Sequence, residues 1–302
     1  MQSGDNFPQP ADEPSENPSE QTMGSLSYCS SCSSAWEAGQ THCSRCGYEG
    51  IGPLAAEYGS PVEFVAAGGR VNHKMGGVPW GIRHIIGGII FVMASLLTAA
   101  AAALFFGNLY PEQEDAVATW FSVHLMGLSI FATVWYLGLR HSRFPLAVLR
   151  LSRVRRPRKR TVLLMFGVLA TSLIATSIYS GIVEWLELDE LTTPVVESDV
   201  FFDGFAVILT FQALAFITPI SEELFFRGFI FRGLIPRLGP WGAMLVSAAV
   251  FSFFHLSVGV LIPILITGFL LAWLYWRTGS LWASIGAHAG QNTLALLAQG
   301  LN

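Results

Sequence analysis

Two glutamates and an arginine interrupt an apolar stretch of the chain, the segment ITPISEELFFRGFIFRG at residues 217–233. Glu223 and Arg227 are four residues apart, so on a helix they share a face and can neutralise each other. Glu222 points about 100° away around the helix and lacks that partner. A charged side chain at the bilayer centre costs about 2.5–3.5 kcal/mol even on insertion scales. The spacing therefore separates a neutralised pair from one carboxylate, Glu222, that is left for chemistry.

The four residues before Glu222 have the composition of a helix start. Pro219 suits the first turn of a helix and disfavours its continuation, and Ser221 is a good capping residue. A helix that begins here would place both glutamates near its N-terminus, where negative charge is favoured. We therefore expect a break or kink at residues 218–221, which would divide an apolar stretch that is too long for one straight span.

Two later motifs repeat the four-residue spacing. In FSFFH, Phe251 and His255 share a helix face, so the aromatic ring can wall the imidazole. In HAGQN, His288 and Asn292 also share a face. Each motif places a polar group inside an otherwise apolar segment, where such groups are rare and often functional.

The turn RLGPW at residues 237–241 determines which of these groups can meet. Glu222 lies 15 residues before Arg237, about 22 Å along a helix, and His255 lies 14 residues after Trp241, about 21 Å. An antiparallel hairpin would bring Glu222 and His255 to the same depth.

One site reached from the cytoplasmic side could therefore gather these polar groups, because His288 and Asn292 lie about 12–18 Å along their own helix from Ser280. A buried glutamate beside a histidine can activate water, and a second histidine with an asparagine can stabilise an oxyanion. Alternatively, Glu222, His255 and His288 are a three-ligand set for an active-site divalent metal with an open fourth position. A purely structural hydrogen-bond network between helices is the third interpretation.

The three motifs, EELFFR, FSFFH and HAGQN in this order on successive apolar segments, resemble the CPBP family. Its members are the CAAX prenyl endopeptidases and the bacteriocin-processing or Abi-type intramembrane proteases. The resemblance covers about residues 200–299. It implies that Glu222 and His255 activate the attacking water. It also implies that His288 and Asn292 stabilise the oxyanion.

The same resemblance implies that Glu223 and Arg227 support the site, and it leaves open whether a metal takes part. The expected activity is that of an intramembrane endopeptidase which hydrolyses membrane-associated protein or peptide substrates. Two alternatives from other classes remain: a non-catalytic membrane scaffold or bacteriocin self-immunity protein, and a transporter with Glu222 as a proton relay. The transporter would predict an internal repeat, and the sequence contains no convincing one.

The composition predicts an all-α multi-pass membrane protein that positions these motifs on helices. The chain is 52% hydrophobic and 13% charged, whereas an average soluble domain carries roughly 25% charged residues. A span needs about 20 apolar residues. About seven transmembrane helices are expected, near residues 84–106, 117–139, 161–183, 201–220 continuing into the first motif, 241–257, 258–276 and 281–299.

The distribution of basic residues predicts the orientation. Of the 17 lysines and arginines, all but Arg227 fall on or at the edge of one side if the N-terminus is cytoplasmic, as the positive-inside rule requires. Arg232 is expected to be an anchor at that edge. The basic run between Arg140 and Arg160 is interpreted as a topology signal against anionic lipid, not as a nucleic-acid site. We expect a multi-pass protein of the cell membrane with the lipid bilayer as its surroundings.

All four cysteines lie in residues 28–48, as two Cys-x-x-Cys pairs separated by ten residues. This spacing is typical of a zinc ribbon with a structural Zn held by four thiolates: Cys29, Cys32, Cys43 and Cys46. Zinc thiolates fit a reducing cytoplasm, and a cytosolic partner is one expected role. The expected organisation is an acidic tail at 1–27, the ribbon at 28–48, a linker at 49–80, N-terminal membrane helices with the basic loop at 81–200, and the CPBP-like core at 201–302.

Overall fold

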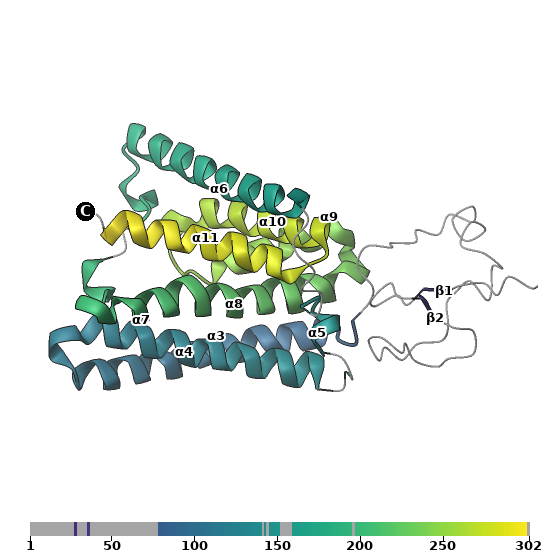
Figure 1. Cartoon of the computed structure of the whole chain (residues 1–302), viewed down its shortest axis with the longest axis horizontal. Coiled ribbons are helices and arrows are strands. Elements are labelled where there is room, and N and C mark those ends of the chain that lie inside the picture. The colour runs from purple at the N-terminus through teal and green to yellow at the C-terminus, as the bar shows by residue number, and fades with distance from the viewer. Residues whose placement is uncertain are drawn as a thin grey trace, which may run out of the picture.

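The computed structural model describes a helical bundle and two very short strands. The described residues are 27–28, 35–36, 78–140, 142, 145–151, 159–194 and 197–300. The long helices lie roughly side by side along the longest axis of the molecule (Figure 1). The named long helices are α3 Ile82–Asn108, α4 Glu114–Val134, α6 Lys159–Trp185, α9 Arg232–Phe253, α10 Leu261–Thr278 and α11 Leu281–Gly300.

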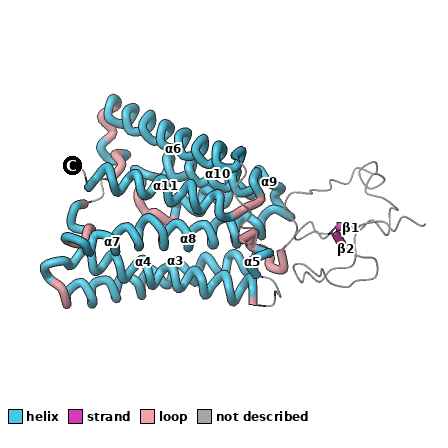
Figure 2. Tube along the Cα trace, in the orientation of Figure 1, coloured by secondary structure: helices cyan, strands magenta, loops and turns pink. Residues whose placement is uncertain are grey.

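A continuous helical run connects the region after α6 to α9 and carries the first motif. It contains α7 Val207–Phe211, a π-helical segment Gln212–Ile217, α8 Thr218–Glu222 and a second π-helical segment Glu223–Phe231. A third π-helical segment, Trp135–Leu139, extends α4, and α5 Pro145–Val148 is a short helix in the following loop. Short 3-10 turns are found at Pro111–Gln113, Asp189–Leu191, Ser198–Val200, Gly204–Ala206 and Val258–Val260. Figure 2 shows that the bundle is helical over almost its whole described length.

The predicted all-α multi-pass fold is confirmed, and helix covers most of each of the seven expected spans. Within the described residues, five segments are long and apolar enough to cross a membrane. One of them, Gly204–Phe253, has 50 residues and is broken at Gly239, whose φ of 65° and ψ of 175° are not helical. The expected turn at 237–241 is therefore present. Helix α11 is not among the five apolar segments.

The two strands fall in the predicted zinc ribbon. β1 Ser27–Tyr28 pairs antiparallel with β2 Ala35–Trp36. In sequence they flank the first Cys-x-x-Cys pair. The four cysteines themselves lie outside the described residues, so the ribbon and its zinc stay a prediction.

The helix that carries the first motif forms the centre of the core. Eight of the nine residues of Glu223–Phe231 are buried, including four phenylalanines. A helix that is buried on all sides must be surrounded by other elements, and it packs against α4, α9, α10 and α11. In Figure 1 the α3–α4 pair lies on one side of the α7–α8 run and α6 lies at the opposite edge, against α10 and α11.

Trp80, two residues before the start of α3, belongs to the hydrophobic core. Its side chain is 4% exposed, its indole Nε1 donates to the Phe229 carbonyl at 2.9 Å, and its ring stacks on Phe229. The expected linker at residues 49–80 ends at this tryptophan. The structure makes it part of the core.

Residues 218–221 do not break the helix, whereas the alternative expectation of a kink there stays a prediction. The helix runs through Pro219 with helical dihedral angles at Ile217 and Glu223, and Ser221 does not cap a helix start. Instead, the Ser221 hydroxyl bonds back to the carbonyls of Ile217 and Thr218. The chain accommodates the proline by changing to π-helical winding before it, which relieves the clash that proline makes in an α-helix.

Arg232 is buried within the protein, and its expected position at the membrane edge stays a prediction. Its side chain is 1% exposed, within the core. The charge pattern predicted its side of the membrane but carried no information about its burial.

Candidate active site

The pair formed by Glu223 and Arg227 is the most buried part of the site. The guanidinium NH1 donates to Glu223 Oε1 at 2.7 Å, and both side chains are 0% exposed. Arg227 NH2 also donates to the Gly268 carbonyl on α10 at 3.1 Å, and its Cζ lies 4.3 Å from the centre of the Phe251 ring. The predicted intrahelical pair is therefore present, and α10 and the Phe251 ring complete its surroundings.

Gly268 allows α10 to approach this pair, and the sequence motifs did not identify it. A Cβ at this position would lie 2.9 Å from Phe251 Cδ1 and 3.2 Å from the Ala248 Cα. A glycine inside a helical pattern often marks such a close approach. That signal was present in the sequence, but nothing there connected it with Arg227.

His288 joins the two glutamates of the first motif. Its Nδ1 lies 3.0 Å from Glu223 Oε1, and its Nε2 lies 3.6 Å from Glu222 Oε2. Because Glu223 Oε1 already accepts from Arg227, it acts as an acceptor and His288 Nδ1 must donate. In the neutral imidazole, Nε2 then carries the lone pair that faces Glu222. Glu222 and His288 therefore face each other at a distance slightly longer than a hydrogen bond.

Exposure distinguishes the two carboxylates. The Glu222 side chain is 20% exposed and that of Glu223 is 0% exposed. Glu222 is therefore the carboxylate that a substrate or water can reach. The sequence had separated these two glutamates by their spacing to Arg227, and the ion pair agrees with that separation.

His255 lies beyond the end of helix α9, and its expected pairing with Glu222 is not seen in the described structure. Helix α9 ends at Phe253, so His255 lies in the following turn and is exposed. Its Nδ1 lies 2.9 Å from the Phe251 carbonyl, and its ring meets Phe251 edge-on with centroids 4.9 Å apart. Within the described part of the chain, the side chain that lies 3.6 Å from Glu222 Oε2 is that of His288 and not that of His255.

Phe251 nevertheless keeps His255 near the other motif residues. The same ring meets His288 edge-on with centroids 5.8 Å apart. The predicted packing of the Phe251 ring against the His255 imidazole is therefore present, and the same ring also contacts His288. The two imidazoles lie around one phenylalanine.

Asn292 contacts the main chain of the α7–α8 run. Its Nδ2 donates to the Leu214 carbonyl at 2.8 Å. His288 and Asn292 are one turn apart on α11, and both bind the run that carries the glutamates, as their shared face predicted.

The expected metal-ligand set does not fit the structure. Within the residues that the structure describes, no three histidine, cysteine, aspartate or glutamate side chains are grouped so that they could hold a metal ion. Glu222 and His288 are close, but the predicted third ligand, His255, lies in the turn after α9. No step of the reaction is therefore assigned to an active-site metal.

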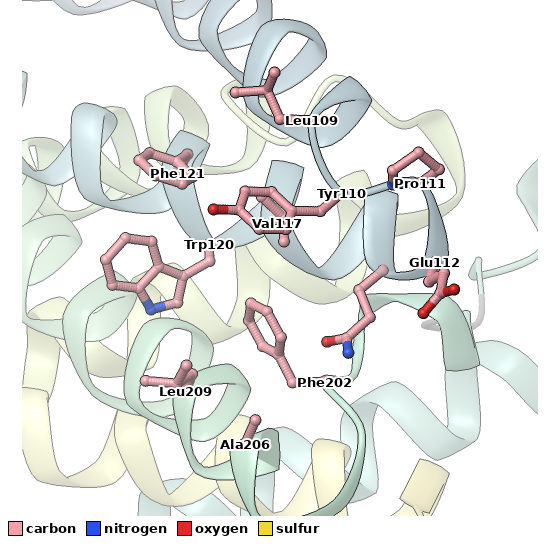
Figure 3. A pocket seen from close by; sticks show the side chains of 11 residues that line it. Leu109, Tyr110, Pro111, Glu112, Val117, Trp120, Phe121, Phe202, Ala206 and Leu209 are labelled. Atoms are coloured by element: carbon pink, nitrogen blue, oxygen red, sulfur yellow. The ribbon is translucent and has the colours of Figure 1, made fainter.

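A separate cavity of about 720 Å³ lies at the end of the bundle where α3 and α4 meet. Figure 3 shows the aromatic side chains of Tyr110, Trp120, Phe121 and Phe202 around it. No residue of the three motifs lines it. Tryptophan and tyrosine are enriched at membrane–water interfaces, which explains this lining without a catalytic role.

The part of the chain that carries the motifs is similar to known proteins. Residues 204–294 match the family model described as Type II CAAX prenyl endopeptidase Rce1-like. A protein of Bacillus subtilis (strain 168) named "Putative membrane peptidase YdiL" is 34% identical over 94 residues, which is 31% of this chain and 38% of that protein. The match thus spans well under half of the Bacillus relative.

A second relative carries a name without an activity. The "UPF0177 protein YxdF" of Lactococcus lactis subsp. lactis (strain IL1403) is 26% identical over 130 residues, which is 43% of this chain and 70% of that protein. No solved structure matches the chain. All three motifs fall inside the range of the family match.

Proposed function

We propose that this membrane protein, whose residues 204–294 match the Rce1-like family model, is an intramembrane endopeptidase. The observation that carries the proposal is the contact between Glu222 and His288. A partly exposed carboxylate faces an imidazole nitrogen at 3.6 Å, while the neighbouring buried pair of Glu223 and Arg227 keeps that imidazole oriented. A base held by a second carboxylate is a recurring arrangement for activating a nucleophile.

In the proposed reaction, Glu222 accepts a proton from water as the water oxygen attacks the carbonyl carbon of the scissile bond. The tetrahedral intermediate then collapses, the C–N bond breaks, and the proton passes to the leaving nitrogen. His288 stabilises the proton while it resides on Glu222, because its Nε2 faces that carboxylate. Glu223 and Arg227 do not exchange protons in this scheme. They orient His288.

His255 is proposed to act from the other side of Phe251. The resemblance implies that it helps to activate the water, and its exposed ring supports contact with a substrate or with that water. The Phe251 ring restricts the imidazole, and the Phe251 carbonyl bonds its Nδ1. His255 Nε2 is then the nitrogen that can contact the substrate.

The proposed substrates are membrane-associated proteins or peptides, because Glu222, Glu223 and Arg227 lie on a segment that is apolar enough to cross a bilayer. Nothing in the site singles out a prenyl group. By the distribution of basic residues, we propose that the N-terminus and the zinc ribbon lie in the cytoplasm of a cell whose membrane contains the bundle. The ribbon would there bind a cytosolic partner.

A comparison of membrane proteomes tests this proposal. Cells that carry the wild-type chain are compared with cells that carry Glu222→Gln at equal abundance, and new N-termini are identified by mass spectrometry. The proposal predicts cleavage products of membrane-associated proteins that are lost in Glu222→Gln. Identical N-termini in both samples, together with a phenotype that survives the substitution, would favour a scaffold or immunity protein.

A further inference from the structure

We infer that Asn292 is a positioning residue: its amide binds the main-chain carbonyl that Pro219 leaves without a donor, and so holds the π-helical winding that presents Glu222. The inference deepens the proposed function and rests on it for its activity readout. It differs from the role in oxyanion binding that the resemblance implies for Asn292.

The main-chain hydrogen bonds before Pro219 follow a π-helical register that the proline interrupts. The Thr218 N–H bonds the Ala213 carbonyl, five residues back, as in a π-helix. The next bond in that register would run from residue 219 to the Leu214 carbonyl, and proline has no N–H. Asn292 Nδ2 donates to that same Leu214 carbonyl at 2.8 Å. One side-chain amide therefore replaces the main-chain donor that the proline lacks.

A carbonyl of this kind needs a partner because it is partly buried between the α7–α8 run and α11. Buried main-chain carbonyls are almost always hydrogen-bonded, and leaving one unbonded in hydrocarbon is costly. Thr218 adds its hydroxyl to the neighbouring Ala213 carbonyl at 3.1 Å. Thr218 and Asn292 together satisfy two adjacent carbonyls at the point where the winding changes.

The winding at this point determines where Glu222 points. Glu222 follows Pro219 by three residues, within α8. A change of one residue in the register rotates all later side chains by about 100° around the helix axis. Such a rotation would move Glu222 away from His288 and move the Glu223–Arg227 pair out of its contact with α10.

Helix α11 is well placed to control this winding. It lies alongside the α7–α8 run (Figure 1) and contacts the π-helical segments on both sides of α8. His288 binds the glutamates after the proline, and Asn292 binds the carbonyl before it. Two residues one turn apart on α11 therefore hold the run on both sides of Pro219.

A double-mutant cycle between Pro219 and Asn292 separates the two roles. Pro219→Ala supplies a main-chain N–H, so in that background the Leu214 carbonyl no longer depends on Asn292. We expect Asn292→Ala to lower both Tm and kcat in the wild-type background. In the Pro219→Ala background, Asn292→Ala should cause a clearly smaller decrease in each. Thr293→Ala, whose hydroxyl bonds only within its own helix in the described structure, serves as the control and should act equally in both backgrounds.

Two results would overturn the inference. If Asn292→Ala lowers kcat by the same factor in both backgrounds, Asn292 acts on the substrate as an oxyanion donor. If Asn292→Ala leaves Tm unchanged in the wild-type background, the Leu214 carbonyl does not depend on it. Should Asn292→Ala not fold, folding of the double variant supports the inference and failure of the double variant contradicts it.

The Tm measurements keep this test separate from the proposed function. They need no substrate, so they decide the inference even if the chain is not a protease. Conversely, cleavage that persists in Glu222→Gln would refute the proposed function and leave the coupling between Pro219 and Asn292 intact.

Discussion

Nδ1 of His288 lies 3.0 Å from Oε1 of Glu223, the oxygen that also accepts from Arg227. This contact connects a buried ion pair on one helix with an imidazole on another. It determines which nitrogen of His288 faces Glu222, because Nδ1 must donate to a carboxylate. The neutralised pair is therefore both a structural element and the group that orients the reacting histidine.

The first prediction concerns the cost of separating this ion pair. Arg227→Met leaves Glu223 as a buried charge without its strongest partner, so we expect a loss of about 3–5 kcal/mol of folding free energy. The double variant Glu223→Gln, Arg227→Met removes both charges and should recover much of that loss. Thermal unfolding in detergent measures both, with Arg83→Met at an exposed position as control. A double variant less stable than Arg227→Met would contradict the assignment.

The second prediction separates the two histidines. His288→Ala removes the donor to Glu223 and the contact with Glu222, so it should abolish cleavage and lower the folding free energy by about 1–3 kcal/mol. His255→Ala removes an exposed ring and should lower cleavage without a measurable change in Tm. Cleavage rates and Tm are measured on the same preparations. Equal destabilisation by the two substitutions would show that His255 is more deeply packed than the structure has it.

The third prediction tests the close approach of α10. Gly268→Ala adds a Cβ 2.9 Å from Phe251 Cδ1 and 3.2 Å from the Ala248 Cα, so we expect a loss of about 1–3 kcal/mol of stability from overpacking. The matched control is Gly167→Ala on α6, where a Cβ meets nothing within 4 Å. That substitution should stabilise its helix by about 1 kcal/mol or less. A neutral Gly268→Ala would show that α10 can move away freely.

The fourth prediction concerns the zinc ribbon. The full-length protein, purified under reducing conditions without chelator, should contain one equivalent of zinc by elemental analysis, because two Cys-x-x-Cys pairs complete a tetrahedral site. Cys29→Ser with Cys46→Ser should lose it, since one thiolate is removed from each pair. A zinc-free wild-type protein from that preparation would refute the ribbon.

The sequence predicted what depends on short-range periodicity. Glu223 with Arg227, and Phe251 with His255, are contacts within one helix or its terminal turn, and residue spacing determines them. The turn at 237–241 was predicted from Gly239 and Pro240, which favour non-helical backbone. These features need no knowledge of how the helices pack.

The parts that the sequence did not predict depend on winding and packing between helices. The expected equal depth of Glu222 and His255 assumes straight α-helices. In the structure, one π-helical segment precedes α8, which contains Glu222, and another follows it. It also assumed that α9 continues to His255, although the helix ends at Phe253. The π-helical winding and the early end of α9 both alter the rise and the rotation per residue on which the expected positions depend. In the structure, His288 and not His255 contacts Glu222. The contact of Asn292 with the Leu214 carbonyl could not be predicted either, because it also depends on helix winding and on packing between helices.

Cleavage of one defined substrate by purified Glu222→Gln tests the central claim most directly. The substitution keeps the size of the side chain and removes its ability to accept a proton, while Glu184→Gln on the exposed end of α6 controls for the loss of a charge. We predict that Glu222→Gln folds with an unchanged Tm and shows no cleavage of a substrate that the wild type and Glu184→Gln cleave equally. Cleavage by Glu222→Gln at the wild-type rate would contradict the account.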